Sequence, residues 1–428
     1  METIEAHRKN IVVLGAGFGG ITAIIKLYRR LKRQGGYQLI LVSKNAQHLY
    51  APALYEIASI PRGEAGAVCL KSSICIQIEE ILARFPGIKF IGEEVGALDP
   101  QERRIIFKSG DVLPFEYAVI ALGAETNFFN IPGLKEHSYP LKTFEDAVRL
   151  RNRVEELVKS TSGRLKVIVG GAGATGVELS AEFVNLLGHI KKKIRTWSGQ
   201  AEIILIEAAP EILSGFSPGT IRRARKRLQK LGIKILTGKF LSRVTAAEVV
   251  FADGSTLPYQ MLVWAGGVRP AEVLKKFGLE LDKKGGIVVN EFLEARAQRG
   301  RPASQERLAS QRIYAIGDCA SFIHPKTKKP VGGNVPVAET EARIAAKNIV
   351  RAIAGERPAS FRPLANYPFI LAVGGKYALT DLVILKFSGF LGWAAKQLVE
   401  LRYLLFILPW GQAFKMWLRA LYYATRND

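Results

Sequence analysis

Two glycine-rich segments have the residue spacing that binds phosphate. Both follow the pattern G-x-G-x-x-G, with Gly15, Gly17 and Gly20 in the first and Gly171, Gly173 and Gly176 in the second. The first glycine of such a loop permits a tight turn, the second lets the backbone approach a pyrophosphate, and the third allows close helix–strand packing. The N-terminus of the next helix also faces the negative charge. Two copies therefore predict two nucleotide sites.

An acidic residue follows the second loop at the place where a ribose would lie. Glu207 ends the strand-like run AEIILIEA, where a carboxylate can accept hydrogen bonds from both ribose hydroxyls and repel a 2′-phosphate. This position favours NADH over NADPH, and an exposed acid at a strand end is the alternative. The equivalent place after the first loop holds Ser43 and Lys44. The first nucleotide must therefore be held differently.

At three further positions, a small or acidic residue follows an apolar run. YAVIALGAETN contains Gly123 and MLVWAGGVRP contains Gly266, and we expect each run to be a buried strand that ends where backbone can approach a ligand. Asp318 in IYAIGDCA follows another such run, from which a carboxylate can hydrogen-bond the ribityl chain of a flavin. An Asp that caps a turn is the alternative.

The elements around the glycine loops predict an α/β fold. Each loop lies between a short β-branched run and a stretch with helical apolar spacing. A second strand-like run follows at 37–44 and at 201–208, which is the interval that a βαβ crossover requires. We therefore expect two Rossmann-like dinucleotide-binding domains. The polar and basic segment 294–312 is expected to be an exposed loop.

Composition and charge narrow the class of partner. The chain has 428 residues, which favours two or three domains, and 48% of them are hydrophobic. Its formal net charge of +23 suggests an anionic partner, either nucleic acid or the acidic face of a membrane. There is no zinc spacing, no RNA-binding aromatic signature and no basic region that leads into heptads. We therefore favour the membrane and expect no nucleic acid partner.

The cysteines predict neither a metal site nor a redox pair. Cys69, Cys75 and Cys319 form no Cys-x-x-Cys motif and no ligand cluster, which fits a reducing compartment. A small redox disulfide between the first two is the alternative to two part-buried thiols. The N-terminal segment METIEAHRKN has no apolar stretch for export, so we expect the mature chain to begin there.

The C-terminal tail, from about Ile370, has the pattern of an interfacial anchor. Charged residues interrupt it, so no apolar window is long enough to span a bilayer. Helical spacing predicts two amphipathic helices separated by Pro409 and Gly411. Their apolar faces would comprise Phe387, Leu391, Ala394, Leu398, Leu401 and Leu405 in the first helix and Phe414, Trp417, Leu418, Leu421 and Tyr422 in the second. The alternative is that these helices dock on the body of the protein or on a homodimer partner.

The motifs together resemble those of one enzyme family. The segments IVVLGAGFGG, KNAQHLYAPALYEIAS, VGGAGATGVELSAEF, LVWAGGVRP and IYAIGDCA, in this order, look like those of type II NADH dehydrogenases, which are flavoproteins with two dinucleotide-binding domains. The resemblance spans almost the whole chain. HLYAPALYEIAS and the tail are more similar to this family than to its relatives.

The resemblance implies which residues bind each cofactor. FAD would bind to the first loop and Asp318, and NADH to the second loop and Glu207. Residues 1–135 and 310–369 would form the FAD domain, 136–309 the NADH domain and 370–428 the membrane-anchoring region. Glu178 matches an acidic position that the family places near nicotinamide and flavin, although an early-helix Glu favoured by the dipole is the alternative. Lys44 matches a lysine that the family also carries there.

By the same resemblance, the enzyme would pass electrons from NADH through FAD to a membrane quinone. It would lie on the cytoplasmic face of a bacterial cell membrane, where a homodimer is possible. The family pattern A-Q-x-A-x-Q near the quinone is absent, since the chain has PVAET at 336–340. Pro336, Ala338 and Tyr377 are our candidates for quinone contacts. A sulfide:quinone oxidoreductase and a slow NADH-sensing flavoprotein are the alternatives.

Overall fold

The computed structural model describes residues 8–161, 163–193, 200–298 and 312–425. Most of the basic loop predicted at 294–312 therefore lies outside the described residues. The chain forms two compact units, which are residues 1–48, 76–125 and 268–367 in the first and 49–75, 126–267 and 368–428 in the second. The three-part division by ligand remains a prediction.

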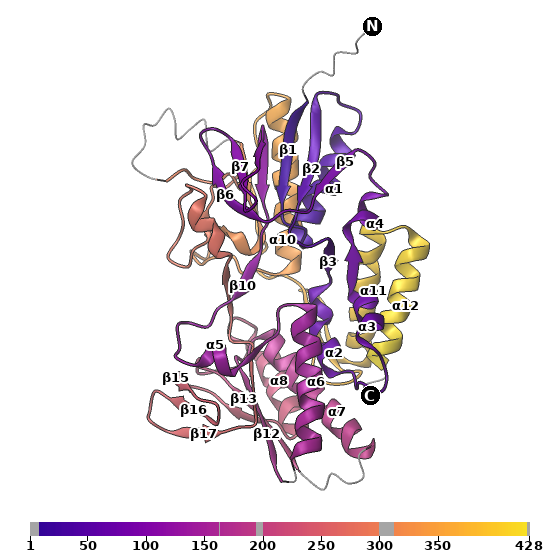
Figure 1. Cartoon of the computed structure of the whole chain (residues 1–428), viewed down its shortest axis with the longest axis vertical. Helices are drawn as coiled ribbons and strands as arrows, with labels where there is room; N and C mark the ends of the chain where they lie inside the picture. Colours follow the sequence, from indigo (N-terminus) through magenta and orange to yellow (C-terminus); the bar gives the residue numbers. More distant parts are fainter. Residues whose placement is uncertain (1–7, 162, 194–199, 299–311, 426–428) are drawn as a thin grey trace. The chain divides into compact units, whose positions relative to one another are not determined.

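A parallel sheet of five strands forms the centre of the first unit (Figure 1). In spatial order its strands are β21 (Ile313–Ala315), β9 (Tyr117–Ile120), β1 (Lys9–Leu14), β2 (Tyr37–Val42) and β5 (Ile88–Ile91). The last four residues of β1 and β2 and all of β9 are buried, which is why these strands read as continuous apolar runs rather than alternating ones.

Two helices of the first unit pack side by side (Figure 1). Helix α1 (Phe18–Leu31) follows β1 and lies on the sheet, and α10 (Val335–Ile353) packs along it. The Asn334 side chain caps α10 by accepting a hydrogen bond from the Val337 amide at 2.9 Å. The smaller elements are η3 (Gly317–Cys319), α4 (Ile78–Leu82), β6 (Val95–Asp99), β7 (Arg104–Phe107), β8 (Val112–Pro114), η2 (Glu272–Lys276), β20 (Ile287–Val288) and β22 (Ala320–Ser321).

The second unit repeats this plan with its own five-stranded parallel sheet. The strand order is β11 (Tyr139–Pro140), β18 (Met261–Trp264), β12 (Leu165–Gly170), β13 (Ala201–Ile206) and β14 (Lys234–Leu236). Its other elements include η1 (Ala51–Ala53), α2 (Leu54–Ser59), α3 (Ala67–Ile74), α5 (Leu134–His137), α6 (Phe144–Ser160), α7 (Ala174–Lys193), α8 (Pro218–Lys230), β15 (Leu241–Val244), β16 (Glu248–Phe251) and β17 (Thr256–Pro258). The α/β expectation is confirmed.

Four short strands lie where the chain passes from one unit to the other. They are β3 (Gln47–Leu49), β4 (Cys75–Gln77), β10 (Ala124–Thr126) and β19 (Val268–Pro270). The chain thus crosses between the units at these four strands and a fifth time between residues 367 and 368, so neither unit is a continuous segment.

The C-terminal segment of the second unit begins with an antiparallel sheet that the sequence did not reveal. Its strands are β23 (Phe369–Ala372), β24 (Ala378–Asp381) and β25 (Lys386–Gly389), and helices α11 (Phe390–Ile407) and α12 (Trp410–Ala424) follow. The two helices meet near Pro409, as predicted, but Phe387 belongs to β25 rather than to a helix. Across the described ranges, no helix combines the length and the apolar character needed to cross a bilayer.

Helix α11 buries three polar residues and exposes several apolar ones, although Arg402 is exposed. Lys396, Gln397 and Glu400 are buried within the second unit, whereas Leu391 and Leu398 are more than 60% exposed. A helix at an ordinary aqueous surface has the opposite arrangement. The outward side of α11 is therefore suited to an apolar environment.

Candidate functional site

The first glycine loop joins β1 to α1 and uses each glycine differently. Gly15 has φ +102°, and a Cβ there would lie 2.3 Å from the Ala121 carbonyl oxygen. A Cβ on Gly20 would lie 1.8 Å from the Gly15 carbonyl oxygen, so the helix can approach the turn only because Gly20 has no side chain. Gly17, at the N-cap of α1, has open space beside it. That opening is where the pattern predicts a pyrophosphate.

The second loop, between β12 and α7, has the same geometry. Gly171 has φ +96°, and its Cβ would lie 2.3 Å from Cα of Gly266. A Cβ on Gly176 would lie 1.9 Å from the Gly171 carbonyl oxygen, and Gly173 has open space beside it. Gly266 therefore has a structural reason to be small, because it meets the turn of the loop directly.

The strand ends beside the two loops differ as the sequence predicted. Glu207 follows β13, and its carboxylate accepts hydrogen bonds from the Ala172 amide at 2.7 Å and the Ala209 amide at 2.8 Å. The carboxylate is thereby fixed beside the second loop. After β2, the exposed Lys44 pairs with Glu94 at 3.7 Å, and the Ser43 amide donates to the Ile91 carbonyl. The first loop thus has no acid at this place.

A second turn lies against the first glycine loop. Asp318 is in η3, and a Cβ on Gly333 would come within 1.9 Å of Asp318 Oδ1, so Gly333 leaves room for this carboxylate. A Cβ on Gly317 would lie 3.5 Å from Cβ of Ala338, and one on Gly19 3.8 Å from the same atom. The turn that carries Asp318 and the start of α1 therefore meet at Ala338.

Glu341 on α10 holds this turn in place, a role that the sequence did not reveal. Its Oε2 accepts a hydrogen bond from the Gly317 amide at 2.6 Å, and burial raises the pKa of Glu341 to about 8. The carboxyl is therefore protonated at neutral pH. Beside it, the Cys319 thiol donates to the carbonyl of Gly123, which has φ +72°.

His48 is another residue that the sequence did not single out. Its imidazole is fully buried, Nδ1 lies 2.8 Å from the Ala16 carbonyl oxygen, and the ring packs edge-on against Phe18. Because a carbonyl only accepts, Nδ1 carries the hydrogen. Burial lowers the pKa of His48 to about 4, so the ring is neutral and supports the glycine loop as a hydrogen-bond donor. Only the tertiary fold brings His48 to Ala16.

In the second unit, two carboxyl groups on α7 hold the backbone around β23. Glu178 accepts from the Ala372 amide at 3.4 Å, and Glu182 accepts from the Gly375 amide at 3.1 Å. Burial raises the pKa of Glu178 to about 8, against the opposing effect of Lys396. The candidate catalytic carboxyl therefore carries a proton at pH 7.

A buried charged cluster extends from these residues to α11. Lys396 hydrogen-bonds to Glu56 on α2 and is 8% exposed. Burial acts to lower the pKa of Lys396, but Glu56 and Glu400 outweigh it and raise that pKa. Burial also raises the pKa of Glu400 to about 7. The cluster can therefore hold protons close to neutral pH.

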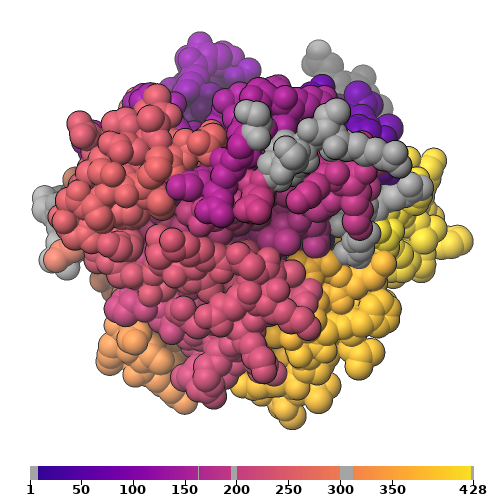
Figure 2. Space-filling view, turned by 90° about the horizontal axis from the view of Figure 1, so that it is seen from below, coloured from indigo at the N-terminus to yellow at the C-terminus, as the bar shows by residue number. Residues whose placement is uncertain are grey.

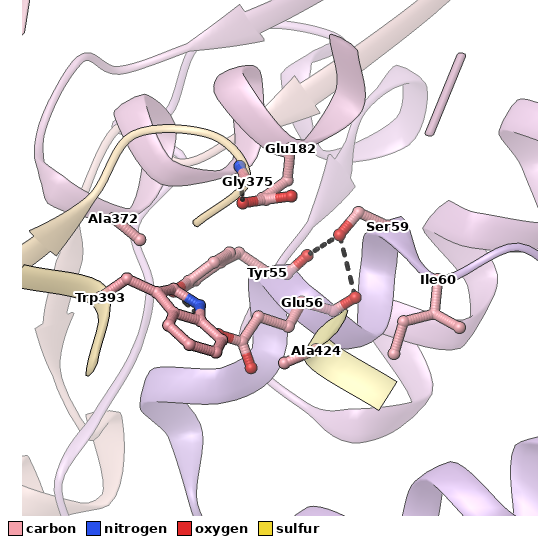
Figure 3. A pocket seen from close by; sticks show the side chains of 9 residues that line it. All are labelled: Tyr55, Glu56, Ser59, Ile60, Glu182, Ala372, Gly375, Trp393 and Ala424. Carbon is pink, nitrogen blue, oxygen red and sulfur yellow. Dashed lines mark hydrogen bonds between the residues drawn. The ribbon is translucent and has the colours of Figure 1, made fainter. Parts of the chain in front are cut away.

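A small pocket opens beside this cluster (Figure 3). Ser59 at its edge donates to the backbone carbonyls of Tyr55 and Glu56, which fixes the end of α2. The lining residues are Tyr55, Glu56, Ser59, Ile60, Glu182, Ala372, Gly375, Trp393 and Ala424. None of them belongs to the candidates chosen from the sequence, since all depend on the folding of α2 and the tail onto α7.

The three candidates for quinone contacts fall in different units. Pro336 and Ala338 lie in the first turn of α10, while Tyr377 lies between β23 and β24. The Arg227 guanidinium stacks 4.6 Å from the centre of the Tyr377 ring. Their role in quinone binding remains a prediction.

The remaining candidates group by unit as the two-site hypothesis requires. The first unit holds Gly15, Gly17, Gly20, Ser43, Lys44, Gly123 and Asp318, and the second holds Gly171, Gly173, Gly176, Glu178, Glu207 and Gly266. Each open glycine edge precedes a helix N-terminus, so the loops fit the pyrophosphate of a dinucleotide. Within the described ranges, no three His, Cys, Asp or Glu side chains gather as a metal site.

Comparisons with known proteins agree with this geometry. The sequence pattern of the pyridine nucleotide-disulphide oxidoreductase family matches residues 9–342. Type II NADH:quinone oxidoreductases from strains of Staphylococcus aureus are 27% identical over 367 residues, which cover 83% of this chain and 85% of theirs.

Solved structures share the fold. The structure of NDH2 from Plasmodium falciparum in complex with NADH has a TM-score of 0.79 at 18% identity and covers 97% of this chain and 98% of its own. The sulfide:quinone oxidoreductase from Aquifex aeolicus has a TM-score of 0.74 at 20% identity, with 93% and 91% covered.

Proposed function

The chain belongs to the pyridine nucleotide-disulphide oxidoreductase family, and we propose that it is an NADH:quinone oxidoreductase with FAD on the first glycine loop and NADH on the second. The observation that carries this proposal is the pair of loops with matching geometry, only one of which has a ribose-binding acid. The names of the Staphylococcus aureus relatives supply the reaction type.

The first unit provides the site for a group that stays bound. A flavin there would supply the redox chemistry, accepting a hydride equivalent and passing electrons onward. Gly17 leaves room for its pyrophosphate, and Asp318 offers a carboxylate to its ribityl hydroxyls. His48 and neutral Glu341 hold the glycine loop and the Asp318 turn by backbone hydrogen bonds. These contacts keep the site rigid.

The second unit provides a site that binds and releases NADH. The fixed carboxylate of Glu207 retains acceptor capacity for ribose hydroxyls and repels a 2′-phosphate. The site is therefore selective against NADPH.

Glu178 is our candidate for holding a proton that reduction of a quinone requires. Its carboxyl is neutral at pH 7, and Lys396, Glu56 and Glu400 form the neighbouring charged cluster. A group whose pKa lies near the working pH both gives up and regains a proton readily.

We place the enzyme on the cytoplasmic face of a bacterial membrane, as a peripheral protein. Leu391 and Leu398 of α11 and Leu418 of α12 are more than half exposed, and such residues suit the headgroup boundary. The net charge of +23 attracts an anionic leaflet. If these faces meet a second copy instead, the protein is a homodimer at this surface.

The cysteines do not favour sulfide as the electron donor. Cys319 is fully buried, and burial raises the pKa of its thiol to about 12. Burial likewise raises the pKa of the Cys75 thiol to about 11, and Cys69 is a free, exposed thiol. A sulfur-accepting site needs readily formed thiolates beside the flavin.

Anaerobic stopped-flow absorbance tests the proposal directly. NADH should bleach the bound flavin, and a short-chain quinone should restore its colour within the turnover time. Bleaching without recovery would leave an NADH-reducible flavoprotein with another acceptor, whereas bleaching by sulfide but not by NADH would overturn the proposal. Reoxidation of the flavin by quinone that is much slower than the turnover of a respiratory enzyme would identify an NADH sensor.

A further inference from the structure

The hairpin between β24 and β25 ends in four consecutive aliphatic residues. The segment is Leu382–Leu385, with sequence LVIL, and Ile384 at its tip is 97% exposed. The Leu382 amide donates to the Leu385 carbonyl at 2.9 Å, which leaves Val383 and Ile384 as a two-residue loop. We call residues 382–385 the apolar tip.

The apolar tip departs from ordinary turn chemistry. Val383 has φ +75°, a conformation that favours glycine or asparagine and is unfavourable for a β-branched side chain. Hairpin loops in water usually carry such small or polar residues. This turn therefore gives up local stability and solubility together, which is understandable if the tip is not in water.

The base of the hairpin is firmly held. Asp381 accepts a hydrogen bond from the Val383 amide at 2.9 Å and pairs with Lys386 at 2.9 Å. Strand β24 is buried along its whole length between β23 and β25. The tip is thus a projection on a rigid support.

A strongly basic helix lies beside this support. Helix α8 contacts β24, and Arg223 attracts the Asp381 carboxylate. Arg227 fixes the helix to the sheet by donating to the carbonyls of Val373 and Gly374. The helix carries six cations and no acid, and these are Arg222, Arg223, Arg225, Lys226, Arg227 and Lys230.

We infer that the apolar tip inserts into the boundary of an anionic lipid bilayer, while the exposed cations of α8 contact the headgroups. This inference rests on the membrane location in the proposed function and adds a second contact region besides α11 and α12. Figure 2 shows the C-terminal segment, in gold to yellow, as a continuous part of one molecular face.

Charge and chemistry favour lipid over a protein partner. A protein surface complementary to α8 would have to be acidic beside a pocket for four aliphatic side chains, whereas an anionic bilayer offers both features at once. A second copy of this chain has the same basic α8, so two such faces would repel each other.

The test replaces the tip by a turn that water favours. In Val383→Gly/Ile384→Asn the glycine suits the positive φ, so the hairpin should fold at least as well as before. The flavin-loaded full chain is floated with vesicles of phosphatidylcholine, with and without phosphatidylglycerol. We expect about tenfold weaker partitioning into both, which corresponds to ~1.4 kcal/mol.

Two control variants separate the contributions. Val112→Asn/Ile323→Asn removes two half-exposed aliphatic side chains from the first unit and should leave partitioning unchanged. Arg222→Gln/Lys226→Gln removes two cations from α8 and should weaken binding only to vesicles that contain phosphatidylglycerol.

Bleaching of the flavin by NADH, measured without vesicles, should be the same in all variants. If NADH does not bleach the flavin of the unaltered protein, the dehydrogenase assignment is wrong, but the inferred lipid contact is not affected. Partitioning of the tip variant equal to that of the unaltered protein would overturn the inference. So would a change from dimer to monomer in light scattering with no change in partitioning, because the tip would then join two copies.

Discussion

The two glycine loops have the same backbone geometry, but their surroundings differ. In both, a Cβ on the third glycine would lie within 2 Å of the carbonyl oxygen of the first, and the middle glycine borders open space. The second loop has Glu207 fixed by two amides, whereas Lys44 follows the strand beside the first. We therefore propose that the loop geometry provides for a pyrophosphate and that the neighbouring residues select the nucleotide.

The supports of the two loops differ as well. Buried His48 and Glu341 hold the first loop and the Asp318 turn through backbone hydrogen bonds. Helix α7 follows the second loop, and its residues Glu178 and Glu182 hold the chain around β23 instead. The second loop is held as well, because its Ala172 amide donates to the Glu207 carboxylate. The two loops therefore differ in which groups hold them.

The largest expected effect comes from adding a side chain at Gly17 or Gly173, the two loop glycines that border open space. Gly17→Val should lower flavin retention at least 100-fold and leave the fold intact, because the backbone there is extended and no protein atom is close. Gly173→Val should keep the flavin and raise the KM for NADH to a similar degree. Flavin absorbance per chain and circular dichroism test both. A yellow Gly17→Val protein contradicts the first site.

The next effect concerns choice between nucleotides. Glu207→Gln should shift the ratio of kcat/KM for NADH over NADPH by about tenfold toward NADPH, because the negative charge that repels a 2′-phosphate is lost. Glu202→Gln, in strand β13 directly before Glu207 and paired with Arg164, is the matched control. An unchanged ratio would remove the role assigned to Glu207.

A moderate effect is expected on the pH dependence of stability, to which the buried carboxyl of Glu341 contributes. The pKa of Glu341 is about 8 in the folded protein, above its ordinary value of 4.5, so the folded state retains a proton that the unfolded state releases. The stabilisation is complete below pH 4.5 and is lost as pH rises through 8, by about 3 kcal/mol between pH 6 and 9. Glu341→Gln should flatten this dependence in thermal unfolding.

Glu339→Gln, on the same helix and paired with Arg343 at 3.1 Å, serves as the control for that experiment. His48 contributes with the opposite sign, because burial lowers its pKa to about 4 and its contribution is lost as pH falls below 6.5. If Glu341→Gln keeps the alkaline loss of stability unchanged, Glu341 does not hold the proton.

The smallest effect is expected at Lys44. Its ion pair with Glu94 spans 3.7 Å and is exposed, and such pairs contribute little. Lys44→Glu, which gives the first loop the acid of the second, should change flavin affinity by no more than about threefold. Equilibrium titration of the apoprotein with FAD measures this. A tenfold change would instead indicate direct contact between Lys44 and the cofactor.

Local sequence was enough to predict the nucleotide folds. The glycine spacing, the apolar strands and Glu207 lie within short segments, so their meaning does not depend on the rest of the chain. His48, Glu341 and Gly333 could not be found in this way, because each meets a residue that is distant in sequence. In the sequence, each is only a polar or small residue whose presence no neighbouring motif explains.

The tail shows the other limit of sequence reasoning. Its helical periodicity correctly located two helices but missed β23, β24 and β25, since short strands beside helices leave little pattern. In the sequence, the charges of the tail served only to exclude a membrane-spanning helix, whereas in the structure Lys396 and Glu400 are buried. The fold supplies the partner of Lys396, Glu56, from a segment more than three hundred residues earlier.

The buried pair of Lys396 and Glu56 means that the tail is not a detachable anchor. Removing residues 370–428 to obtain a soluble enzyme would leave Glu56 without its cation and would strip Glu178 and Glu182 of the amides that they hold. Truncation would thus impair the protein's interior along with the membrane attachment that we propose. A soluble form is better sought by replacing outward leucines of α11 one at a time, which leaves this interior connection whole.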